Sequence, residues 1–385
     1  MKETVKSPSR LLVIGLEKGL FTAGNPARER IVRQMAECGL ERATILVFAR
    51  VPFDEEIAPG IRVISTDSST RLLYVTDALR IVWSLRKEGF DVVSSQDPVE
   101  TGLVASLAAH LYGSALAVQD HGYYFHGNYY RKESFLNYFR YWFARWAVKR
   151  ADAVRVVSLR TERALISLGI AKEKMVRFAV SPTHNVERIT NNITIDDAMD
   201  VKDAGRDGRY FLLAARFVPI KRIDLAIHAF SLIASKHPDV KLLIVGRGTW
   251  DVGRKVEEFN LTERVRILPW TDQLQGLYQG AIATLITSDR EGFGLTAVES
   301  LSNGTPVVMT DVGCAGEVVQ DGVNGYIVPV GDVDALADRM ERVMGDEGLR
   351  QRAKEIVYPK PESDMLEFYR RALMRYGKQH GQTEG

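Results

Sequence analysis

Two glutamates bracket a glycine-rich stretch, E-G-F-G-L-T-A-V-E, at residues 291–299. Carboxylates placed in this way can act as an acid–base pair, bind a metal, or accept hydrogen bonds from ligand hydroxyl groups. The residues between Glu291 and Glu299 lead into an expected helix, whose unpaired backbone N–H groups and dipole favour an anion. Because both glutamates then belong to one phosphate-binding turn, the pattern disfavours a hydrolytic pair. A surface loop with a solvated Glu299 is the alternative interpretation.

Two cations stand close together in A-A-R-F-V-P-I-K-R, residues 214–222. Arg216 ends an expected strand, and Lys221 lies on the following loop or first helical turn, so both point to the carboxyl edge of the sheet. No acidic residue follows them before Asp224, so we expect the two cations to bind an anion. Ordinary surface charge is the alternative. Such cations beside a helix N-terminus suit a diphosphate leaving group, which gains negative charge as its bond to a sugar breaks.

Polar residues also follow two strands expected in the first half of the chain. His121 follows A-V-Q-D, while Gln96, Asp97 and Glu100 follow D-V-V-S-S. The carboxyl ends of parallel strands meet at one edge of a sheet, so we expect these residues to face a common site. A structural histidine and loop capping by the other residues are the alternatives. Gly24 lies in a turn after the first expected strand and before another helix.

Short apolar runs alternate with amphipathic helical stretches along the chain, from L-L-V-I-G near the start to G-Y-I-V-P-V near the end. Nearly continuous apolar strands separated by helices predict parallel sheets covered on both faces. Polar residues 184–209 interrupt this alternation and predict a domain boundary. We therefore expect an α/β protein with two doubly wound domains and a ligand site in the cleft between them. The expected parts are 1–190, 191–360 and a C-terminal helix in 361–385 that crosses back to the first domain.

Composition excludes several classes of protein. The chain has 385 residues, of which 45% are hydrophobic and 26% charged, as in soluble proteins with two ordinary cores. A net charge of +2 is too small for a dedicated nucleic-acid binder. Cys38 and Cys314 lack metal-ligand spacing, which favours a reduced cytoplasmic setting. No apolar run approaches the ~18 residues of a membrane span, and the short run at the start predicts a strand, not a signal peptide.

Two further patterns are weak signals of cofactors. G-D-V-D at residues 331–334 has the D-x-D pattern of metal-dependent transferases. Asp332 as a helix N-cap and Asp334 in the first helical turn explain it without a metal, so we predict no metal site. V-G-R-G at residues 245–248 lacks the third glycine of a dinucleotide fingerprint, which weakens the interpretation as an NAD enzyme.

An aromatic stripe recurs at helical spacing after Ser134, from Phe135 to Trp146. We interpret it as a helix that packs its aromatic face on the first sheet. The alternative is that part of this region, especially Tyr123 to Lys132, contacts an anionic membrane surface, where aromatic and basic residues are both favourable.

The charged motifs resemble those of the retaining family-4 glycosyltransferases of the GT-B fold, also described as glycosyl transferases group 1. The resemblance covers most of the chain and is carried by R-F-V-P-I-K, V-G-R-G, V-R-I-L-P-W, E-G-F-G-L-T-A-V-E and N-G-T-P-V-V. It implies two Rossmann-like domains facing a central cleft. It also implies transfer of a sugar, with retention, from a nucleotide diphosphate sugar to a hydroxyl of a glycan, lipid-linked or small-molecule acceptor. The implied setting is polysaccharide or glycolipid synthesis in the cytoplasm, with peripheral contact at the inner membrane face and no cofactor beyond the donor.

The resemblance also assigns roles to residues. It places Glu291 on donor-sugar hydroxyls, Glu299 on ribose hydroxyls, and His121 near the donor sugar. The implied catalytic residues are His121, Glu291, Arg216 and Lys221. The implied donor-binding residues are Gly24, Arg216, Lys221, Gly246, Leu268, Phe293, Gly294, Leu295 and Glu299. Gln96, Asp97 and Glu100 are expected to meet the acceptor. The family commonly has two glycines where this chain has only Gly24.

Two other functions remain open at this point. A sugar-nucleotide epimerase of the same fold would need acid–base groups on both faces of the sugar, and product analysis without an acceptor would identify it. A non-catalytic nucleotide- or glycan-binding protein would bind the donor without breaking it, so donor hydrolysis by the purified protein would exclude that function.

Overall fold

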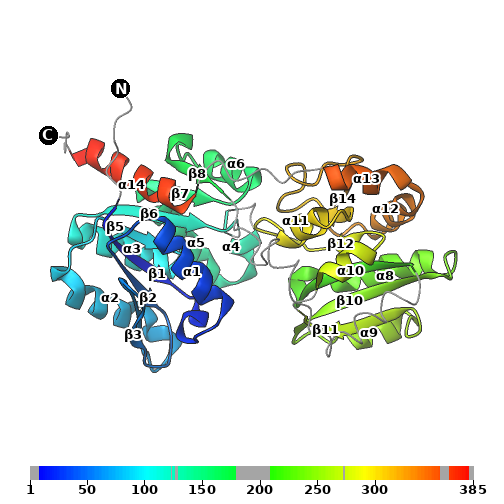
Figure 1. The fold of residues 1–385 in the computed structure, drawn as a ribbon, viewed down its shortest axis with the longest axis horizontal. Helices are drawn as coiled ribbons and strands as arrows, with labels where there is room; N and C mark the ends of the chain where they lie inside the picture. Colours follow the sequence, from blue (N-terminus) through cyan, green and yellow to red (C-terminus); the bar gives the residue numbers. More distant parts are fainter. Residues whose placement is uncertain are drawn as a thin grey trace. The chain divides into compact units, whose positions relative to one another are not determined.

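The computed structural model describes residues 8–122, 124–125, 129–178, 209–271, 274–355 and 364–380. The chain divides into two compact units, of which the first joins residues 1–179 to 361–385 and the second comprises residues 180–360 (Figure 1). The boundary expected near residue 190 lies outside the described residues. Within the described part, no helix is both long enough and apolar enough to cross a bilayer.

The first unit is built on an eight-stranded sheet in the order β3-β4-β2-β1-β5-β6-β7-β8. Neighbouring strands pair in parallel except β3, which runs antiparallel to β4 at the edge. The chain winds outward in both directions from β1 and β5, so the switch point of the sheet lies between these two strands. The strands are β1 (Arg10–Gly15), β2 (Arg42–Val47), β3 (Asp54–Ala58), β4 (Ile61–Ser65), β5 (Val92–Ser95), β6 (Ala115–Asp120), β7 (Ala153–Val156) and β8 (Met175–Arg177).

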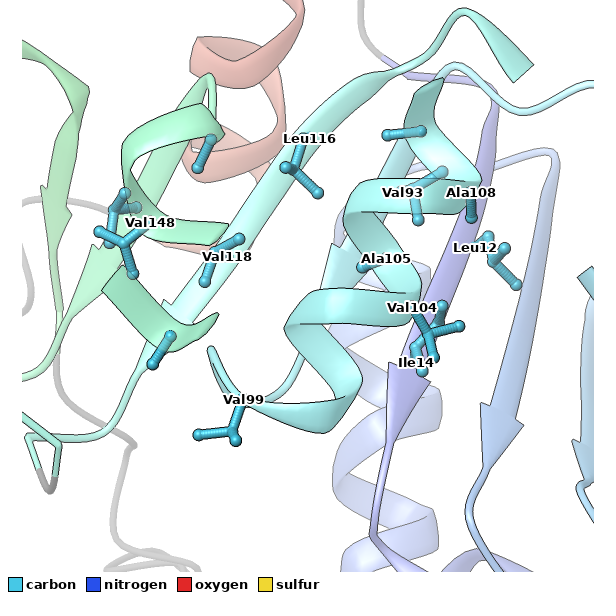
Figure 2. Packing of buried hydrophobic residues seen from close by; sticks show 14 of the residues in the cluster. Leu12, Ile14, Val93, Val99, Val104, Ala105, Ala108, Leu116, Val118 and Val148 are labelled. Atoms are coloured by element: carbon cyan, nitrogen blue, oxygen red, sulfur yellow. The ribbon is translucent and has the colours of Figure 1, made fainter. Parts of the chain in front are cut away.

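Helices cover both faces of this sheet because successive strand residues point to opposite sides. Leu12 and Ile14 of β1 pack with α2, α3 and α5, as Figure 2 shows for α3. Leu11 and Val13 pack on the other face with α1 and α14. The helices are α1 (Pro26–Glu37), α2 (Tyr74–Ser84), α3 (Glu100–Tyr112), α4 (Tyr129–Glu133), α5 (Phe135–Arg150), α6 (Leu159–Ser167) and α14 (Met365–His380).

Helix α14 belongs to the core of the first unit although it follows the second unit in sequence. Its buried side chains join the same hydrophobic cluster as β1, β2 and α1. The helix packs along β6 and β7, and to a lesser extent β5. The four side chains that it buries are Met365, Phe368, Tyr369 and Ala372.

The orientation of α5 differs from the sequence interpretation. We expected its aromatic face to pack on the sheet, but the aromatic side chains point outward and the interpretation is wrong. The face that packs inward is Asn137, Tyr141, Ala144, Ala147 and Val148. Small residues allow α3 and α5 to approach closely, since a Cβ on Gly102 would lie 3.3 Å from the Ala147 Cβ. Helical periodicity locates such a stripe but does not say which face is buried.

The second unit has a six-stranded parallel sheet in the order β11-β10-β9-β12-β13-β14. Its switch point lies between β9 and β12. Helices α8, α9 and α12 pack on one face and α10 on the other. The strands are β9 (Arg209–Phe217), β10 (Val240–Gly248), β11 (Val265–Pro269), β12 (Thr284–Ile286), β13 (Val307–Thr310) and β14 (Gly325–Val328). The helices are α8 (Ile223–Ala234), α9 (Val252–Glu258), α10 (Leu274–Gly280), α11 (Leu295–Ser302), α12 (Val333–Gly345) and α13 (Glu347–Glu355). The predicted class, α/β with two doubly wound domains, is confirmed.

Candidate active site

The candidate site of the second unit lies at the switch point, where the chain leaves β9 and β12. Lys221 ends the 3-10 turn Pro219–Lys221 after β9, and Glu291 lies in the loop after β12. The Lys221 Nζ is 2.5 Å from Glu291 Oε1, which also accepts a hydrogen bond of 2.7 Å from the Ser288 hydroxyl. Both charged side chains are largely buried, at 19% and 14% exposed. The structure therefore brings together two predicted site residues that are distant in sequence.

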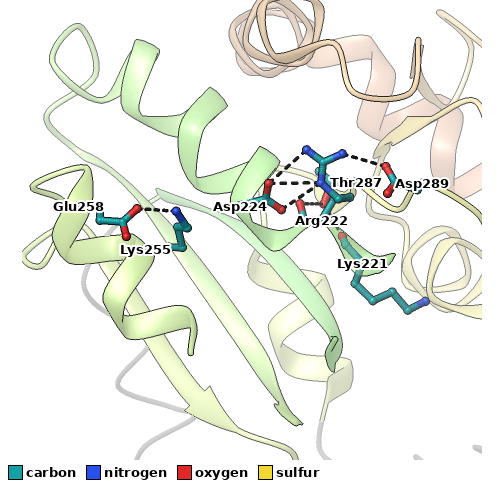
Figure 3. Close-up of polar contacts among 7 residues, drawn as sticks. All are labelled: Lys221, Arg222, Asp224, Lys255, Glu258, Thr287 and Asp289. Atoms are coloured by element: carbon teal, nitrogen blue, oxygen red, sulfur yellow. Dashed lines mark hydrogen bonds and ion pairs between the residues drawn. The ribbon is translucent and has the colours of Figure 1, made fainter. Parts of the chain in front are cut away.

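This ion pair corrects one part of the sequence reasoning. We expected Lys221 to lack an acidic partner before Asp224, but its partner is Glu291. Asp224 instead pairs with Arg222, and Figure 3 shows the Lys221 side chain extending away from that pair. An anion at Lys221 would thus share the ammonium group with Glu291.

Arg222 fixes the turn that carries Lys221. Its backbone is left-handed, with φ 46°, which is costly for a residue other than glycine. Its guanidinium pairs with Asp224 and lies 3.0 Å from Asp289, and these hydrogen bonds raise the pKa of Arg222 (Figure 3). The Thr287 hydroxyl donates to the backbone carbonyls of Lys221 and Arg222 at 2.9 and 2.8 Å. Residues that follow β12 thus hold the strained turn that follows β9. Strained backbone held in place by its surroundings is common at functional sites.

Arg216 lies near the end of β9, the strand that leads to Lys221, and is exposed. Arg247 of β10 is its partner in the strand register and is exposed as well. Both arginines follow strand positions that face α10, so the two guanidinium groups emerge on one face of the sheet. Within the described part of the chain, no carboxylate pairs with either side chain. Sequence reasoning missed Arg247, and its place in V-G-R-G at the end of a strand was the available signal.

Gly246 and Leu268, which were expected to bind the donor, have structural roles in this unit. A Cβ on Gly246 would lie 1.9 Å from the carbonyl oxygen of Ala215 on the neighbouring strand, so only glycine fits there. Leu268 is 7% exposed and packs in the cluster between the sheet and α10. Donor contact by these two residues stays a prediction.

The glycine-rich loop leads directly into α11. Gly294 is the N-cap of this helix with φ 93°, a conformation that favours glycine. The first backbone N–H groups of a helix generally lack an intrahelical partner and favour an anion, which makes that of Leu295 the candidate contact. The Ala297 N–H already donates to the Gly294 carbonyl at 2.9 Å. The loop is held from behind by Cys314, whose N–H donates to the Phe293 carbonyl at 2.7 Å. Gly313 approaches so closely that a Cβ would lie 2.4 Å from that carbonyl oxygen.

Glu299 lies in α11, one turn beyond the loop. Its Oε2 accepts a hydrogen bond of 2.9 Å from the hydroxyl of Tyr278, which α10 contributes. Tyr278 is buried, and burial together with the nearby carboxylate raises its pKa well above the usual value, so the hydroxyl stays a donor. Sequence reasoning missed Tyr278 because it lies on another helix. The contact orients the carboxylate that was predicted to bind ribose.

We expect Glu299→Ala to weaken binding of the bare nucleoside diphosphate by about 10-fold or more, because a hydrogen bond to a charged group contributes ~1.5–3 kcal/mol. Tyr278→Phe should have a smaller effect in the same direction, because it removes only the orienting contact. Isothermal titration calorimetry with each nucleoside diphosphate measures both. Equal affinities in wild type and Glu299→Ala would remove the ribose assignment.

The first unit also has polar residues at its switch point. Gln96 follows β5, and its Oε1 accepts a hydrogen bond of 3.1 Å from the Leu16 N–H after β1. A Cβ on Gly15 would lie 2.1 Å from this oxygen, so a larger residue there would require the Gln96 side chain to move. Gly24 has φ 77° and is exposed, and the next residue, Asn25, caps α1 through the Ala27 N–H.

The acidic residues predicted to meet an acceptor have partners of their own. Asp97 is buried and accepts from the Val99 N–H at 2.8 Å, which is loop capping, and burial raises its pKa. Glu100 forms an ion pair with Arg140 of α5. Their contact with an acceptor stays a prediction.

His121 lies at the carboxyl end of β6, directly after Asp120, and keeps contact with solvent. Desolvation by the surrounding protein and the nearby charge of Arg155 nevertheless lower the pKa of its imidazole to about 4. Asp120 is fully buried and accepts from the Gly122 N–H at 2.9 Å, and burial raises its pKa to about 7. The hydrogen bond from Gly122 closes the turn that carries His121. A buried carboxyl group therefore supports the exposed imidazole through the backbone.

The D-x-D pattern has the structural explanation that was predicted. Asp332 is the N-cap of α12 and accepts from the Ala335 N–H at 2.9 Å, while Asp334 lies in the first turn. Among the described residues, no group of three or more His, Cys, Asp or Glu side chains is arranged to hold a metal. Cys38 and Cys314 are free and buried, and burial raises the pKa of each thiol to about 12.

Comparison with solved structures defines the class of the fold. Anabaena HepE in complex with UDP superposes with a TM-score of 0.68 at 18% identity, covering 97% of this chain and 98% of that chain. Sucrose-phosphate synthase from Thermosynechococcus elongatus superposes with a TM-score of 0.72 at 19% identity, with the same coverage of 97% and 98%. Two Rossmann-like units of this topology place the protein in the GT-B class of glycosyltransferase folds.

Sequence comparison then identifies the family. Residues 23–180 match the family described as glycosyl transferase 4-like domain, and residues 195–358 match glycosyl transferases group 1. The two matches agree with the resemblance to the group 1 glycosyltransferases that the motifs predicted.

Curated relatives match over part of their length. The poly(glycerol-phosphate) alpha-glucosyltransferase of Bacillus subtilis is 32% identical over 174 residues, which are 44% of this chain and 26% of that protein. The D-inositol 3-phosphate glycosyltransferase of Mycolicibacterium smegmatis is 26% identical over 254 residues, or 60% of this chain and 58% of that protein. The phosphatidyl-myo-inositol mannosyltransferase of Mycobacterium leprae is 31% identical over 176 residues, which are 43% of this chain and 46% of that protein.

Proposed function

We propose that this protein is a retaining hexosyltransferase that moves a sugar from a nucleotide diphosphate sugar to an acceptor hydroxyl. The observation that carries the proposal is the site at the β9–β12 switch point, where Arg216, the Lys221–Glu291 pair and the N-terminus of α11 gather. Cations and free backbone N–H groups at one sheet edge suit a diphosphate, and adjacent carboxylates suit sugar and ribose hydroxyls. The match of residues 195–358 to the glycosyl transferases group 1 family supports the same chemistry.

Each side chain has a proposed role in the reaction. Arg216 and Lys221 hold the diphosphate and stabilise the charge that it gains when the bond to the sugar breaks. Glu291 contacts the hydroxyl groups of the sugar while it is paired with Lys221, so one pair links the sugar to its leaving group. Glu299 binds the ribose, and His121 of the first unit contacts the sugar being transferred. The departing diphosphate accepts the proton of the attacking hydroxyl on the same face, which retains the configuration.

We propose an acceptor that is a glycan, a lipid-linked molecule or a small molecule, in polysaccharide or glycolipid synthesis. The names of the relatives support this range, because they include a poly(glycerol-phosphate) glucosyltransferase and a phosphatidyl-myo-inositol mannosyltransferase. The buried free thiols are consistent with a cytoplasmic location. Peripheral contact with an anionic membrane would bring the enzyme to a lipid-linked acceptor.

The proposal is tested first by binding and then by turnover. A thermal-shift screen should find one nucleoside diphosphate that raises the melting temperature, since a ligand at ~100 times its dissociation constant adds about 2.7 kcal/mol. UDP is the first probe, because the HepE structure contains it. Release of UDP from UDP-glucose, with and without acceptors, then measures cleavage. If no nucleoside diphosphate stabilises the protein, the donor site is refuted. An altered sugar nucleotide formed without acceptor would instead identify an epimerase.

We further expect activity to persist in EDTA. The charges of Arg216 and Lys221, with the N–H groups before α11, supply the leaving-group stabilisation that a metal provides elsewhere. The aspartates of the D-x-D pattern already serve as a helix cap and a first-turn residue. Initial rates measured before and after chelation test this. Loss of activity with EDTA that magnesium or manganese restores would contradict it.

A further inference from the structure

Helix α5 exposes aromatic side chains where a helix on a soluble domain normally presents polar ones. Phe135 is 82% exposed and Trp146, the least exposed of the group, is 38% exposed. Rings contact one another from Phe135 to Trp142, with Phe135 and Phe139 edge to face at 5.1 Å between centroids. We call the six residues the aromatic face: Phe135, Tyr138, Phe139, Trp142, Phe143 and Trp146. A contiguous exposed apolar patch of this kind marks an interaction surface.

The neighbouring helix α3 also exposes apolar side chains. It packs against α5 on the same side of the sheet and exposes Leu107 and Leu111 at 41% and 42%. These leucines stand four residues apart, so they lie one turn apart on one side of α3. Exposed apolar side chains therefore occur on two adjacent helices of one layer.

The charges around the aromatic face are all positive on α5. The helix carries four cations, Arg140, Arg145, Lys149 and Arg150, and no acidic residue. Arg145 lies over the Trp142 ring at 5.4 Å and Arg150 over the Trp146 ring at 5.2 Å. Arg140 pairs with Glu100, but no carboxylate in the described ranges pairs with the other three. The surface therefore offers exposed tryptophans beside unneutralised cations.

We propose that the aromatic face of α5, with its flanking cations, docks on an anionic lipid surface. Tryptophan and tyrosine are favoured at the boundary between headgroups and acyl chains, and each Lys or Arg near an anionic leaflet adds to binding. The face combines both features on one helix that lies on the domain surface, as interfacial helices do.

Charge complementarity also favours lipid over a second copy of this chain. A two-fold contact centred on the C-terminal half of α5 would bring Arg145, Lys149 and Arg150 close to the same cations of the partner. No acid on α5 would neutralise them, and juxtaposed like charges oppose association. An anionic leaflet supplies the missing countercharge.

This assignment replaces the stretch that the sequence suggested. Tyr123 lies outside the described residues, Tyr130 is buried, and the Arg131 guanidinium lies over the Tyr141 ring at 4.7 Å. Lys132 is exposed, but the first exposed aromatic residue of this region in the described part is Phe135, on α5. The inference rests on the proposed function in one respect: a lipid-linked acceptor is the reason for docking on a membrane. Lipid binding is measured without sugar transfer, so the two proposals can fail separately.

Sedimentation with lipid vesicles tests the docking surface. The intact protein should sediment with vesicles of phosphatidylglycerol mixed with phosphatidylcholine at low salt, and less as salt rises. Lys149→Glu with Arg150→Glu should lower the partition coefficient at least ~10-fold, because two attractive charges become repulsive. Phe135→Ser with Phe139→Ser should also lower it, while circular dichroism and the melting temperature stay near wild type.

The matched control places the same charge change on the opposite helix layer. Arg33 of α1 and Lys378 of α14 are exposed there, so Arg33→Glu with Lys378→Glu should leave binding near wild type. An equal loss in this control would show unspecific charge attraction and overturn the proposal. Absence of sedimentation at low salt would overturn it too. Light scattering that finds a dimer, dissociated by Phe135→Ser with Phe139→Ser, would assign the face to a second copy instead.

Discussion

Replacing either Arg216 or Lys221 with alanine should lower turnover by roughly 10²-fold or more at saturating donor. Both cations lie beside the site where a diphosphate is proposed to leave, and its negative charge grows as the transition state is reached. An interaction that strengthens in this way affects kcat more than binding of the ground state. Initial rates of UDP release from UDP-glucose, measured with the cognate acceptor, test the expectation.

The two variants should differ in a second measurement. Lys221→Ala also leaves Glu291 largely buried without its cation, so it should disturb the sugar contact as well as the diphosphate contact. Arg216 is exposed and has no such partner in the described ranges, so its loss should act on the diphosphate alone. Lys255→Ala is the control, because it breaks a surface ion pair on α9 (Figure 3) and should leave turnover unchanged. Near wild-type turnover in both site variants would refute the leaving-group role.

Gly313→Ala should disrupt the glycine-rich loop that leads into α11. The new Cβ would lie 2.4 Å from the carbonyl oxygen of Phe293, which is backbone and must move. We expect a loss of about 10-fold or more in nucleoside diphosphate affinity, since the displaced loop carries the N–H groups before α11. A left-handed residue other than glycine also costs about 1–3 kcal/mol of stability. Calorimetry and thermal unfolding measure the two effects.

Gly316→Ala is the control that adds left-handed backbone strain without a steric clash. Gly316 has φ 75°, so alanine is strained there as it is at Gly313, where φ is 55°. No atom lies within 4 Å of the Cβ position at Gly316. This variant should lose similar stability but bind the nucleotide almost normally. If both variants bind equally well, the contact between Gly313 and Phe293 does not position the loop.

Most of the fold was predictable because apolar runs of different length and period distinguish parallel strands from helices. The hairpin of β3 and β4 was not anticipated, because β3 is a charged edge strand, D-E-E-I-A, without an apolar run. The outward direction of the aromatic face was also missed. A helix with one apolar stripe has the same period whether that stripe meets a sheet or faces outward.

The candidate site was predictable in its residue types but not in its pairings. Arg216, Lys221, Glu291 and Glu299 were identified from local motifs, and the structure places them at one sheet edge or on the adjoining helix. The Lys221–Glu291 pair joins residues 70 positions apart, and only strand order brings β9 beside β12. Tyr278 and Gly313 act on the site from other elements for the same reason.

The packing of α14 on the first sheet bears on the order in which the protein can be completed during synthesis. The segment that covers one face of β6 and β7 is translated only after residues 180–360 of the second unit. At roughly 5–20 residues per second, that interval is on the order of ten seconds or more. During it, the sheet face that later receives Phe368 and Tyr369 has no α14 against it. The first unit therefore receives helix α14, the last part of its core, only after the second unit has been translated.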